Sequence, residues 1–222
     1  MTPTPREVLQ SIRREFAPED GANRLIAPIE QGTAPLAVLR ELAAQQHHVI
    51  TSDRRSFLLL ATRCSDSPVG GYFSRLADGE SRALTALASF TAGCGRDAAT
   101  GPGREPLAGC QSYPNYLAWL ALNGDPTAVV LALTANFAAW GEYCAITARA
   151  LRRRYGFDDA SCAFFDFFAV PAPELEDEAV SVITAGGLTP ERIALGRRYA
   201  RLLQHYELLF WNTLAEQVPG LG

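Results

Sequence analysis

The sequence has little that would mark a nucleic-acid-binding protein. Its 20 Lys and Arg residues are scattered among 24 Asp and Glu residues, for a net charge of −4, so no basic stripe is available for nucleic acid or anionic lipid. The one cluster of positive charge, Arg152 to Arg154, is explained by its place at the end of a predicted helix. We therefore expect no nucleic-acid partner.

Cysteine is also scarce, and its spacing is uninformative for metal binding. The five cysteines form an odd set with no CxxC pair, which argues against a disulfide framework and against a zinc site. We expect small buried hydrophobic residues instead. They are Cys64, Cys94, Cys110, Cys144 and Cys162.

Histidine and glycine motifs for metals and nucleotides are missing as well. On a helix, His47 and His48 would point about 100° apart and could not chelate one ion together. No Glu-x-x-His, nucleophile elbow, phosphate-binding Gly-Lys-Ser/Thr or strand-linked Gly-x-Gly-x-x-Gly occurs. Solvated or structural roles are favoured for the histidines, His205 included. The sequence predicts no metal and no cofactor.

Targeting and membrane signals are weak. Residues 1–16 carry Arg and Glu where a signal peptide has an apolar core, so we expect a cytoplasmic protein. The most apolar segment, 128–148, contains Asn136 and Glu142, which argues against a membrane span. No Pro/Ser-rich or charge-rich linker divides the chain, so we expect one domain over 1–222.

Helix signals follow one another along the chain, and no segment sustains the two-residue alternation of a strand. The clearest helix is 125–156, because Asp125 can cap it, Pro126 fits its first position and Gly156 can end it. Its interior is apolar on every face, which is typical of the central helix of a bundle. We predict an all-α bundle of about seven to nine helices in a single domain. Further helices are predicted at 5–17, 22–31, 35–62, 74–92, 112–124, 173–187 and 189–217.

Two segments are expected to lie outside helices. Residues 66–73 contain Ser, Pro and Gly-Gly, which are typical of a loop. Segment 93–109 has five Gly and two Pro and is a candidate mobile loop. Whether it closes over a ligand is left open.

Several predicted helices carry a polar side chain on an otherwise apolar stripe. Gln46 and Asp53 interrupt the stripe of 35–62, and Glu207 interrupts the stripe of the last helix. An isolated carboxylate in an apolar interior is costly unless it is paired or protonated, so such groups indicate a pocket. The candidate substrate-binding residues at these inward positions, or beside them, are Gln46, Asp53, Tyr113, Tyr116, Asn136, Glu142, Tyr143, Phe164 and Phe210.

Each candidate also has an ordinary structural interpretation. Tyr113 and Tyr116 step by three with Trp119, share a predicted face, and could belong to the core. Gln46 could be a satisfied interior amide. Glu142 could point toward Arg149 or out between helices. Because several helices each place a polar group inward, a pocket is favoured over ordinary structural roles for all of these residues.

Three segments resemble the TenA (thiaminase II) and PqqC superfamily. The segment 31–50, QGTAPLAVLRELAAQQHHVI, is similar to the start of its first long helix. Residues 112–120, SYPNYLAWL, resemble the aromatic helix beside its pocket, and 206–214, YELLFWNTL, are similar to its terminal Tyr-Glu-x-x-Phe-Trp signature. The resemblance implies a haem-oxygenase-like helical bundle that binds a small molecule in its interior. It also implies a homodimer or homotetramer.

The resemblance assigns a role to the acid on the last helix. In thiaminase II the Glu of the terminal helix is the catalytic acid/base, and Glu207 matches it. Tyrosines that line the aminopyrimidine pocket of that family are similar to Tyr113 and Tyr143. The resemblance therefore implies that Glu207, Tyr113 and Tyr143 line a ligand pocket.

Other family positions are replaced. The pocket Asp aligns with Gln46, and the nucleophilic Cys aligns at or near Ala139, which we add to the candidate substrate-binding residues. Cys144 is nearby but would point about 140° away. The ligands of the iron-binding branch fall near Gly109, Tyr116, Phe168, Ala172 and Leu175, so each is replaced by an apolar or phenolic group and we predict no metal.

Three functions therefore remain open. The first is a metal-independent enzyme acting on a small planar nitrogen heterocycle, with Glu207 as acid/base and a water in place of the missing thiolate. The second is a non-catalytic small-molecule-binding or accessory protein of a biosynthetic pathway. The third is an interaction protein whose interior is filled by side chains.

Overall fold

The computed structural model describes residues 3–95 and 104–220, and within them the chain forms nine helices and no strand. The predicted all-α bundle is therefore confirmed. The helices are α1 (Pro5–Glu15), α2 (Ile26–Gln31), α3 (Leu36–Arg63), α4 (Pro68–Gly93), α5 (Ala108–Asn123), α6 (Pro126–Arg154), α7 (Asp159–Ala169), α8 (Pro173–Gly186) and α9 (Pro190–Ala215).

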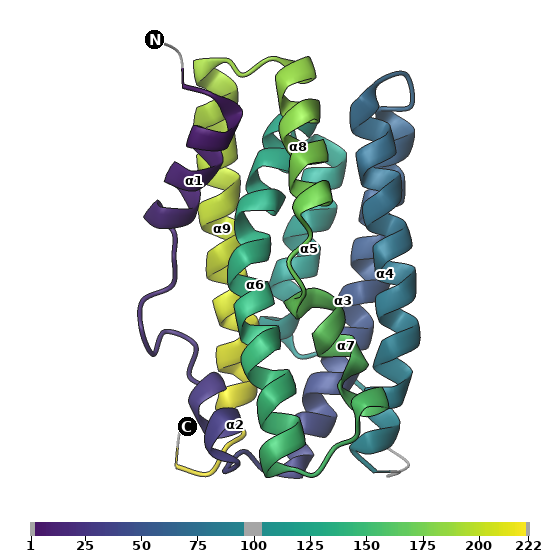
Figure 1. Ribbon diagram of the computed structural model, residues 1–222, viewed down its shortest axis with the longest axis vertical. Helices are drawn as coiled ribbons and strands as arrows, with labels where there is room; N and C mark the ends of the chain where they lie inside the picture. Colours follow the sequence, from purple (N-terminus) through teal and green to yellow (C-terminus); the bar gives the residue numbers. More distant parts are fainter. Residues whose placement is uncertain (1–2, 96–103, 221–222) are drawn as a thin grey trace.

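The long helices run along the long axis of an elongated bundle (Figure 1). The two short helices α7 and α8 follow each other along one face, α8 toward the upper end and α7 toward the lower end. Helices α1 and α2 lie at opposite ends of the flank formed by α6 and α9. The connection between α7 and α8 therefore crosses that face near its middle.

Helix α6 is the central element, as its composition predicts. It contacts α9 and α7 most extensively and also packs against α1, α2 and α8. Every residue from Thr127 to Asn136 is buried, so the first half of the helix has no solvent-facing side. The second half buries only one face. An all-round apolar sequence is what such a position requires.

The predicted limits of α6 are confirmed. The Asp125 carboxylate accepts a hydrogen bond of 2.9 Å from the Ala128 amide, Pro126 occupies the first turn, and Gly156 adopts a φ of 73° just beyond the helix. A capped first turn satisfies amides that would otherwise have no partner. The same logic starts α1, where Thr4 and Glu7 form a capping box.

The loop predicted at 66–73 is wrong, because α4 begins at Pro68 and runs without a break through Gly79. Gly70 is needed for a close approach rather than for a turn. A Cβ added there would lie 2.5 Å from the carbonyl oxygen of Cys64 at the end of α3. Glycine thus lets two antiparallel helices pack immediately after their short connection.

The predicted start of the aromatic helix is also wrong. Helix α5 begins at Ala108, and Pro114 lies inside it. Tertiary contacts support the extra turns: the Leu107 amide donates to the Gln45 side chain at 3.0 Å, and Gly109 packs directly on Thr213 of α9. Residues 96–103, the centre of the segment 93–109 considered as a lid, lie outside the described residues.

Helix α6 is the one helix in the described chain that is long and apolar enough to cross a membrane by length and composition. Half of its most apolar window is buried inside the bundle. The same composition is expected of a central helix surrounded by other helices. The packing around α6 accounts for its hydropathy without a bilayer.

Candidate functional site

A cavity of about 860 Å³ lies between α3, α4, α5, α6, the α7–α8 connection and α9. Flat aromatic rings form much of its wall, and they are supplied by Phe57, Tyr113, Phe137, Trp140, Phe167, Phe168 and Phe210. A few polar groups interrupt this apolar wall, which is the usual composition of a small-molecule site. The interior of the bundle is therefore not filled by side chains.

Glu207 of α9 reaches this cavity and is held by the central helix. Its Oε2 accepts a hydrogen bond of 2.8 Å from Nδ2 of Asn136, which also lies 3.3 Å from Oε1 of Gln204. Only 5% of Glu207 is exposed, and its Oε1 has no hydrogen-bond partner. One oxygen is thus fixed in position, while the other is buried without a hydrogen-bond partner.

Burial raises the pKa of Glu207 to about 8. The hydrogen bond from Asn136 opposes this rise because it favours the carboxylate. The indole of Trp211 has a smaller effect in the same direction, although its Nε1 completes no hydrogen bond. A carboxyl group that titrates near neutral pH can both donate and accept a proton, as a general acid/base must.

A second acidic group lies in the same cavity and comes from α3 and α4. Asp53 and Glu80 both line the cavity, and Asp53 Oδ1 is buried without a partner. Burial, followed by the neighbouring Glu80, raises the pKa of Asp53 well above its usual value. Burial also raises the pKa of Glu80 to about 8. The phenol of Tyr113 faces these acids, and its pKa is raised by burial and then by Asp53 and Glu207.

The structure brings seven of the sequence-predicted residues together around the cavity. Gln46, Asp53, Tyr113, Asn136, Glu142, Glu207 and Phe210 line it. Glu142 is exposed and also lines a smaller cavity of about 190 Å³ between α1, α6 and α9. It therefore belongs to the edge of the large cavity rather than to its buried interior.

Four other predicted residues do not line the large cavity. Ala139 lines the smaller one. Tyr143 faces α9 but packs its ring on Trp211, with centroids 5.7 Å apart. Phe164 is fully buried in the core. Tyr116 lies in an aromatic stack with Trp119.

The expectation that Tyr113, Tyr116 and Trp119 share a face is wrong. Tyr113 lines the cavity, whereas 48% of Trp119 is exposed to solvent. Three helical residues turn through about 300°, so each step of three drifts by about 60°. Two such steps carry the third ring about 120° from the first, which separates the inner ring from the outer one.

Sequence reasoning missed Glu80, Trp140 and Phe168. Glu80 was detectable, because Phe73, Ala77, Glu80 and Ala83 form a stripe with steps of three and four, as around Asp53. Trp140 lies one turn after Asn136 on α6. Phe168 precedes a connection whose path over the cavity no local pattern reveals.

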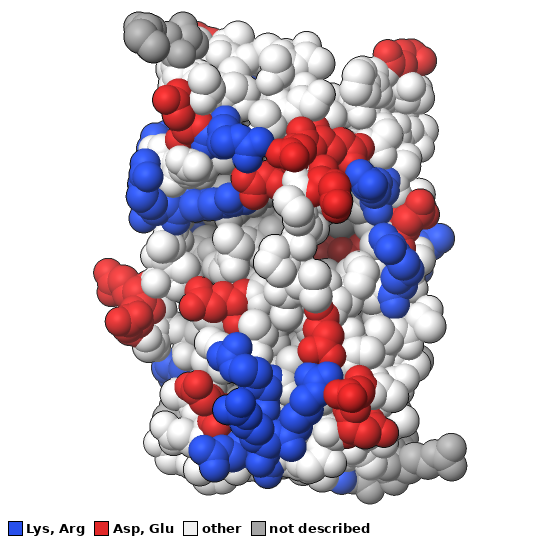
Figure 2. Space-filling view, viewed as in Figure 1, with Lys and Arg blue, Asp and Glu red and all other residues white. Residues whose placement is uncertain are grey.

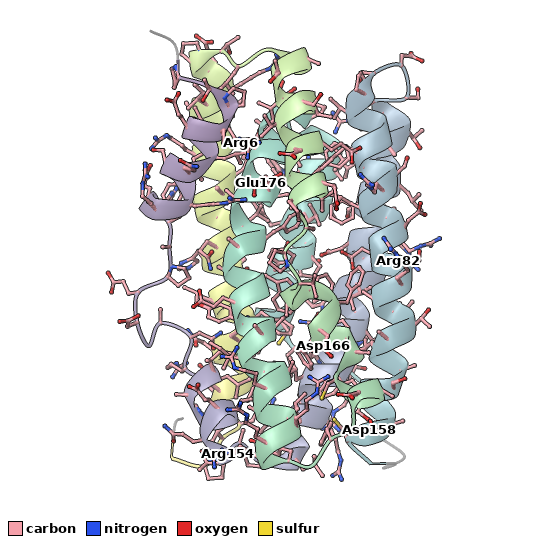
Figure 3. All side chains as sticks on the ribbon, viewed as in Figure 1. Arg6, Arg82, Arg154, Asp158, Asp166 and Glu176 are labelled. Carbon is pink, nitrogen blue, oxygen red and sulfur yellow. The ribbon has the colours of Figure 1, made fainter. Side chains whose placement is uncertain are left out.

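Ion pairs between α1 and α8 lie at the edge of the cavity in the upper half of the bundle. Arg13 Nη2 of α1 donates to Glu176 of α8 at 2.8 Å and to the Thr134 carbonyl at 3.0 Å. Arg6 and Glu176 lie side by side there, as the labelled side chains in Figure 3 show. In Figure 2 an acidic group over α8 lies between basic groups, above a hollow in which acidic atoms are visible.

Neither a thiol nor a cluster of metal ligands is found at this cavity in the described part of the chain. All five cysteines are free, and none lines the cavity. Cys144 is fully buried in the core, and burial raises its pKa well above the usual value. Within residues 3–95 and 104–220, no group of three or more His, Cys, Asp or Glu residues could hold a metal ion.

Comparison with known proteins identifies the family of this bundle. The model of the TENA/THI-4/PQQC family matches residues 24–217, so the chain belongs to that family. A search of the curated proteins gave no match.

Solved structures share the fold at low sequence identity. A TenA homologue from Pseudomonas syringae pv. tomato superposes with a TM-score of 0.77 at 12% identity, covering 97% of this chain and 98% of that one. A TenA homologue from P. horikoshii gives 0.68 at 15% identity, with 96% of each chain covered. A domain of unknown function with a haem-oxygenase-like fold, from Shewanella denitrificans, gives 0.67 at 16% identity, covering 98% and 94%. The predicted haem-oxygenase-like fold is confirmed.

Proposed function

We propose that this protein is a metal-independent enzyme of small-molecule metabolism that acts on a small planar nitrogen heterocycle. The observation that supports this most is Glu207, a buried carboxyl group at the cavity with one oxygen held by Asn136 and the other without a hydrogen-bond partner. The flat rings of Tyr113, Trp140 and Phe168 suit a planar ligand, because aromatic faces favour stacked or edge-on contacts.

The reaction we propose is hydrolysis of a bond between carbon and nitrogen. Glu207 in its protonated form donates its proton to the leaving nitrogen as the bond breaks. A water attacks the carbon, forms the new bond between carbon and oxygen, and returns a proton to the Glu207 carboxylate. Water takes the place of a thiol because none of the described cysteines reaches the cavity.

Replacing Glu207 by Gln tests the assignment. The amide keeps the size and the hydrogen-bonding capacity but cannot transfer a proton, so turnover should fall by about 10²- to 10⁴-fold while ligand binding changes little. Glu30→Gln, at an exposed position on α2, is the matched control. Undiminished turnover in Glu207→Gln would show that another group is the acid/base.

The alternative is a non-catalytic binding or accessory protein, which the absence of a described thiol at the cavity favours. A thermal-shift screen of pyrimidines, pyridines and indoles, followed by product analysis, separates the two functions. Stabilisation with chemical conversion supports the enzyme. Stabilisation without conversion by the unmodified protein supports the binding protein.

We further propose a cytoplasmic protein that is a single domain over 1–222 and assembles as a homodimer or homotetramer. The exposed apolar residues Trp119 and Leu122 on α5 provide a surface on which copies could pack. Light scattering coupled to size exclusion gives the mass of the particle. A monomer at micromolar concentration would contradict the proposed assembly.

A further inference from the structure

Asp53 and Glu80 place two carboxyl groups on one wall of the cavity from adjacent helices. Asp53 belongs to α3 and Glu80 to α4, which pack against each other along their length. Asp53 is 5% exposed and its Oδ1 has no hydrogen-bond partner. A buried carboxyl oxygen without a partner is unfavourable, so it is a place where a ligand group can gain binding free energy.

The cations around the cavity are already engaged elsewhere. Arg13 of α1 pairs with Glu176, and Arg75 of α4 pairs with Glu178 of α8. Arg82 of α4 lies over the ring of Phe167. Among the described residues, no ion pair joins any of them to Asp53 or Glu80.

Apart from these three arginines, the other titratable groups that line the cavity with the pair are acidic. Tyr113 of α5 and Glu207 of α9 lie inside the cavity, and Glu142 of α6, with Glu174 and Glu176 of α8, line its edge. The described structure therefore pairs none of these buried acids with a basic side chain, since the three arginines that line the cavity are engaged with other groups. When the acids are ionised, they repel an anionic ligand group and attract a cationic one.

We infer that Asp53 and Glu80 form a subsite for a cationic nitrogen group of the ligand, either an amidinium or a protonated amine. Such a group carries several N–H donors and can bridge both carboxylates through charge-assisted hydrogen bonds. A single hydroxyl donor would satisfy only one of the two carboxyl groups. This inference rests on the proposed function, because it assumes one ligand whose cationic end binds Asp53 and Glu80 and whose reacting end contacts Glu207.

Proton balance gives the subsite a measurable signature. Without a ligand, burial raises the pKa of Glu80 to about 8, so Glu80 carries a proton at neutral pH, and burial raises the pKa of Asp53 well above its usual value. A bound cation favours the ionised carboxylates, and the displaced protons leave to the solvent. Affinity for a permanent cation should therefore rise as the pH increases from about 6 to about 8.

Matched small probes test the charge preference on the full-length protein. Benzamidine is a planar cation, benzamide is its neutral counterpart and benzoate is its anionic one. Calorimetry in two buffers of different ionisation enthalpy should show benzamidine binding at least about tenfold more tightly than benzamide, with release of protons. Benzylamine compared with benzyl alcohol repeats the test for a protonated amine.

Isosteric variants then locate the effect. Asp53→Asn and Glu80→Gln should each weaken benzamidine binding by about tenfold or more and reduce the proton release. Asp78→Asn, at an exposed position on α4, is the control and should bind benzamidine like the unmodified protein. Circular dichroism and urea unfolding verify that each variant is folded.

The proposal is overturned if neither cation binds more tightly than its neutral counterpart, or if the folded Asp53 and Glu80 variants retain full affinity. Glu207→Gln separates this result from the proposed function. That variant should lose turnover but keep the preference for benzamidine. If the unmodified protein has turnover but shows no preference for benzamidine, the subsite proposal has failed. If it prefers benzamidine but has no turnover, the proposed function has failed.

Discussion

Asn136 Nδ2 donates a hydrogen bond of 2.8 Å to Oε2 of Glu207, and this contact links the central helix to the last helix at the wall of the cavity. The donor favours the ionised form of the acid, whereas burial favours the protonated form. The two effects together determine the pH at which Glu207 exchanges its proton.

Removing this donor should move the titration of Glu207 upward. In Asn136→Ala the carboxylate loses a hydrogen bond, so its pKa should rise by about one to two units, given about 1.5–3 kcal/mol for a bond to a charged group. Because the proposed mechanism uses the protonated acid, the fall in turnover at high pH should shift upward by the same amount. A pH–rate profile measures it, with Asn115→Ala on the exposed face of α5 as control. An unmoved profile would contradict the role given to Asn136.

Stability should decrease between mildly acidic and mildly alkaline pH because of the buried acids. The pKa values of Glu207 and Glu80 are each raised to about 8 in the folded protein, whereas in the unfolded chain both titrate near 4.5, the ordinary value of a Glu carboxyl. Between those values the folded state binds more protons, so the free energy of unfolding falls as the pH rises. Each group contributes up to about 1.4 kcal/mol per pH unit.

Urea unfolding at several pH values from about 5 to about 8 measures this slope. Glu207→Gln removes one of the groups and should make the slope shallower, while Glu30→Gln, with an exposed carboxylate, should leave it unchanged. Identical slopes in Glu207→Gln and the unmodified protein would show that Glu207 titrates normally.

Glycine at position 109 should be required for the contact between α5 and α9. A Cβ there would lie 1.9 Å from Oγ1 of Thr213, so Gly109→Ala should destabilise the protein by about 1–3 kcal/mol, as overpacking does. Adding Thr213→Ala removes the closest atom and should recover most of the loss. Gly71→Ala is the matched control, since no atom lies within 4 Å of its Cβ. That change should stabilise helix α4 by up to about 1 kcal/mol.

Thermal unfolding compares these three variants, at about 2–4 °C per kcal/mol for a chain of this size. If Gly109→Ala and Gly71→Ala have the same melting temperature, the close approach of α5 to α9 does not require glycine at position 109. A double variant no more stable than Gly109→Ala would show that the clash involves other atoms.

Local signals explain why much of the fold was predictable. The caps at Asp125 and Thr189, and the prolines that follow them, define helix starts through contacts within four residues. Apolar stripes with steps of three and four identified which helix faces turn inward, and Asp53 and Glu207 stood out on them. These properties depend only on neighbours along the chain.

Other features depended on contacts between distant segments. Helix α5 starts earlier than its sequence indicates because Gln45 of α3 holds the Leu107 amide. Tyr143 shares a predicted face with Asn136, but its ring packs on Trp211 of α9 and does not line the cavity. Glu80 became part of the site only because α4 packs beside α3.

The sequence by itself determined the helices, their inward faces and the acid at 207, since helix periodicity and capping are encoded within a few residues. Only the tertiary structure decided which inward side chains meet. The cavity exists where helices separated by up to about 190 residues fail to fill the space between them, and no short-range pattern specifies that volume. The pairing of Asn136 with Glu207, and of Asp53 with Glu80, follows from that packing.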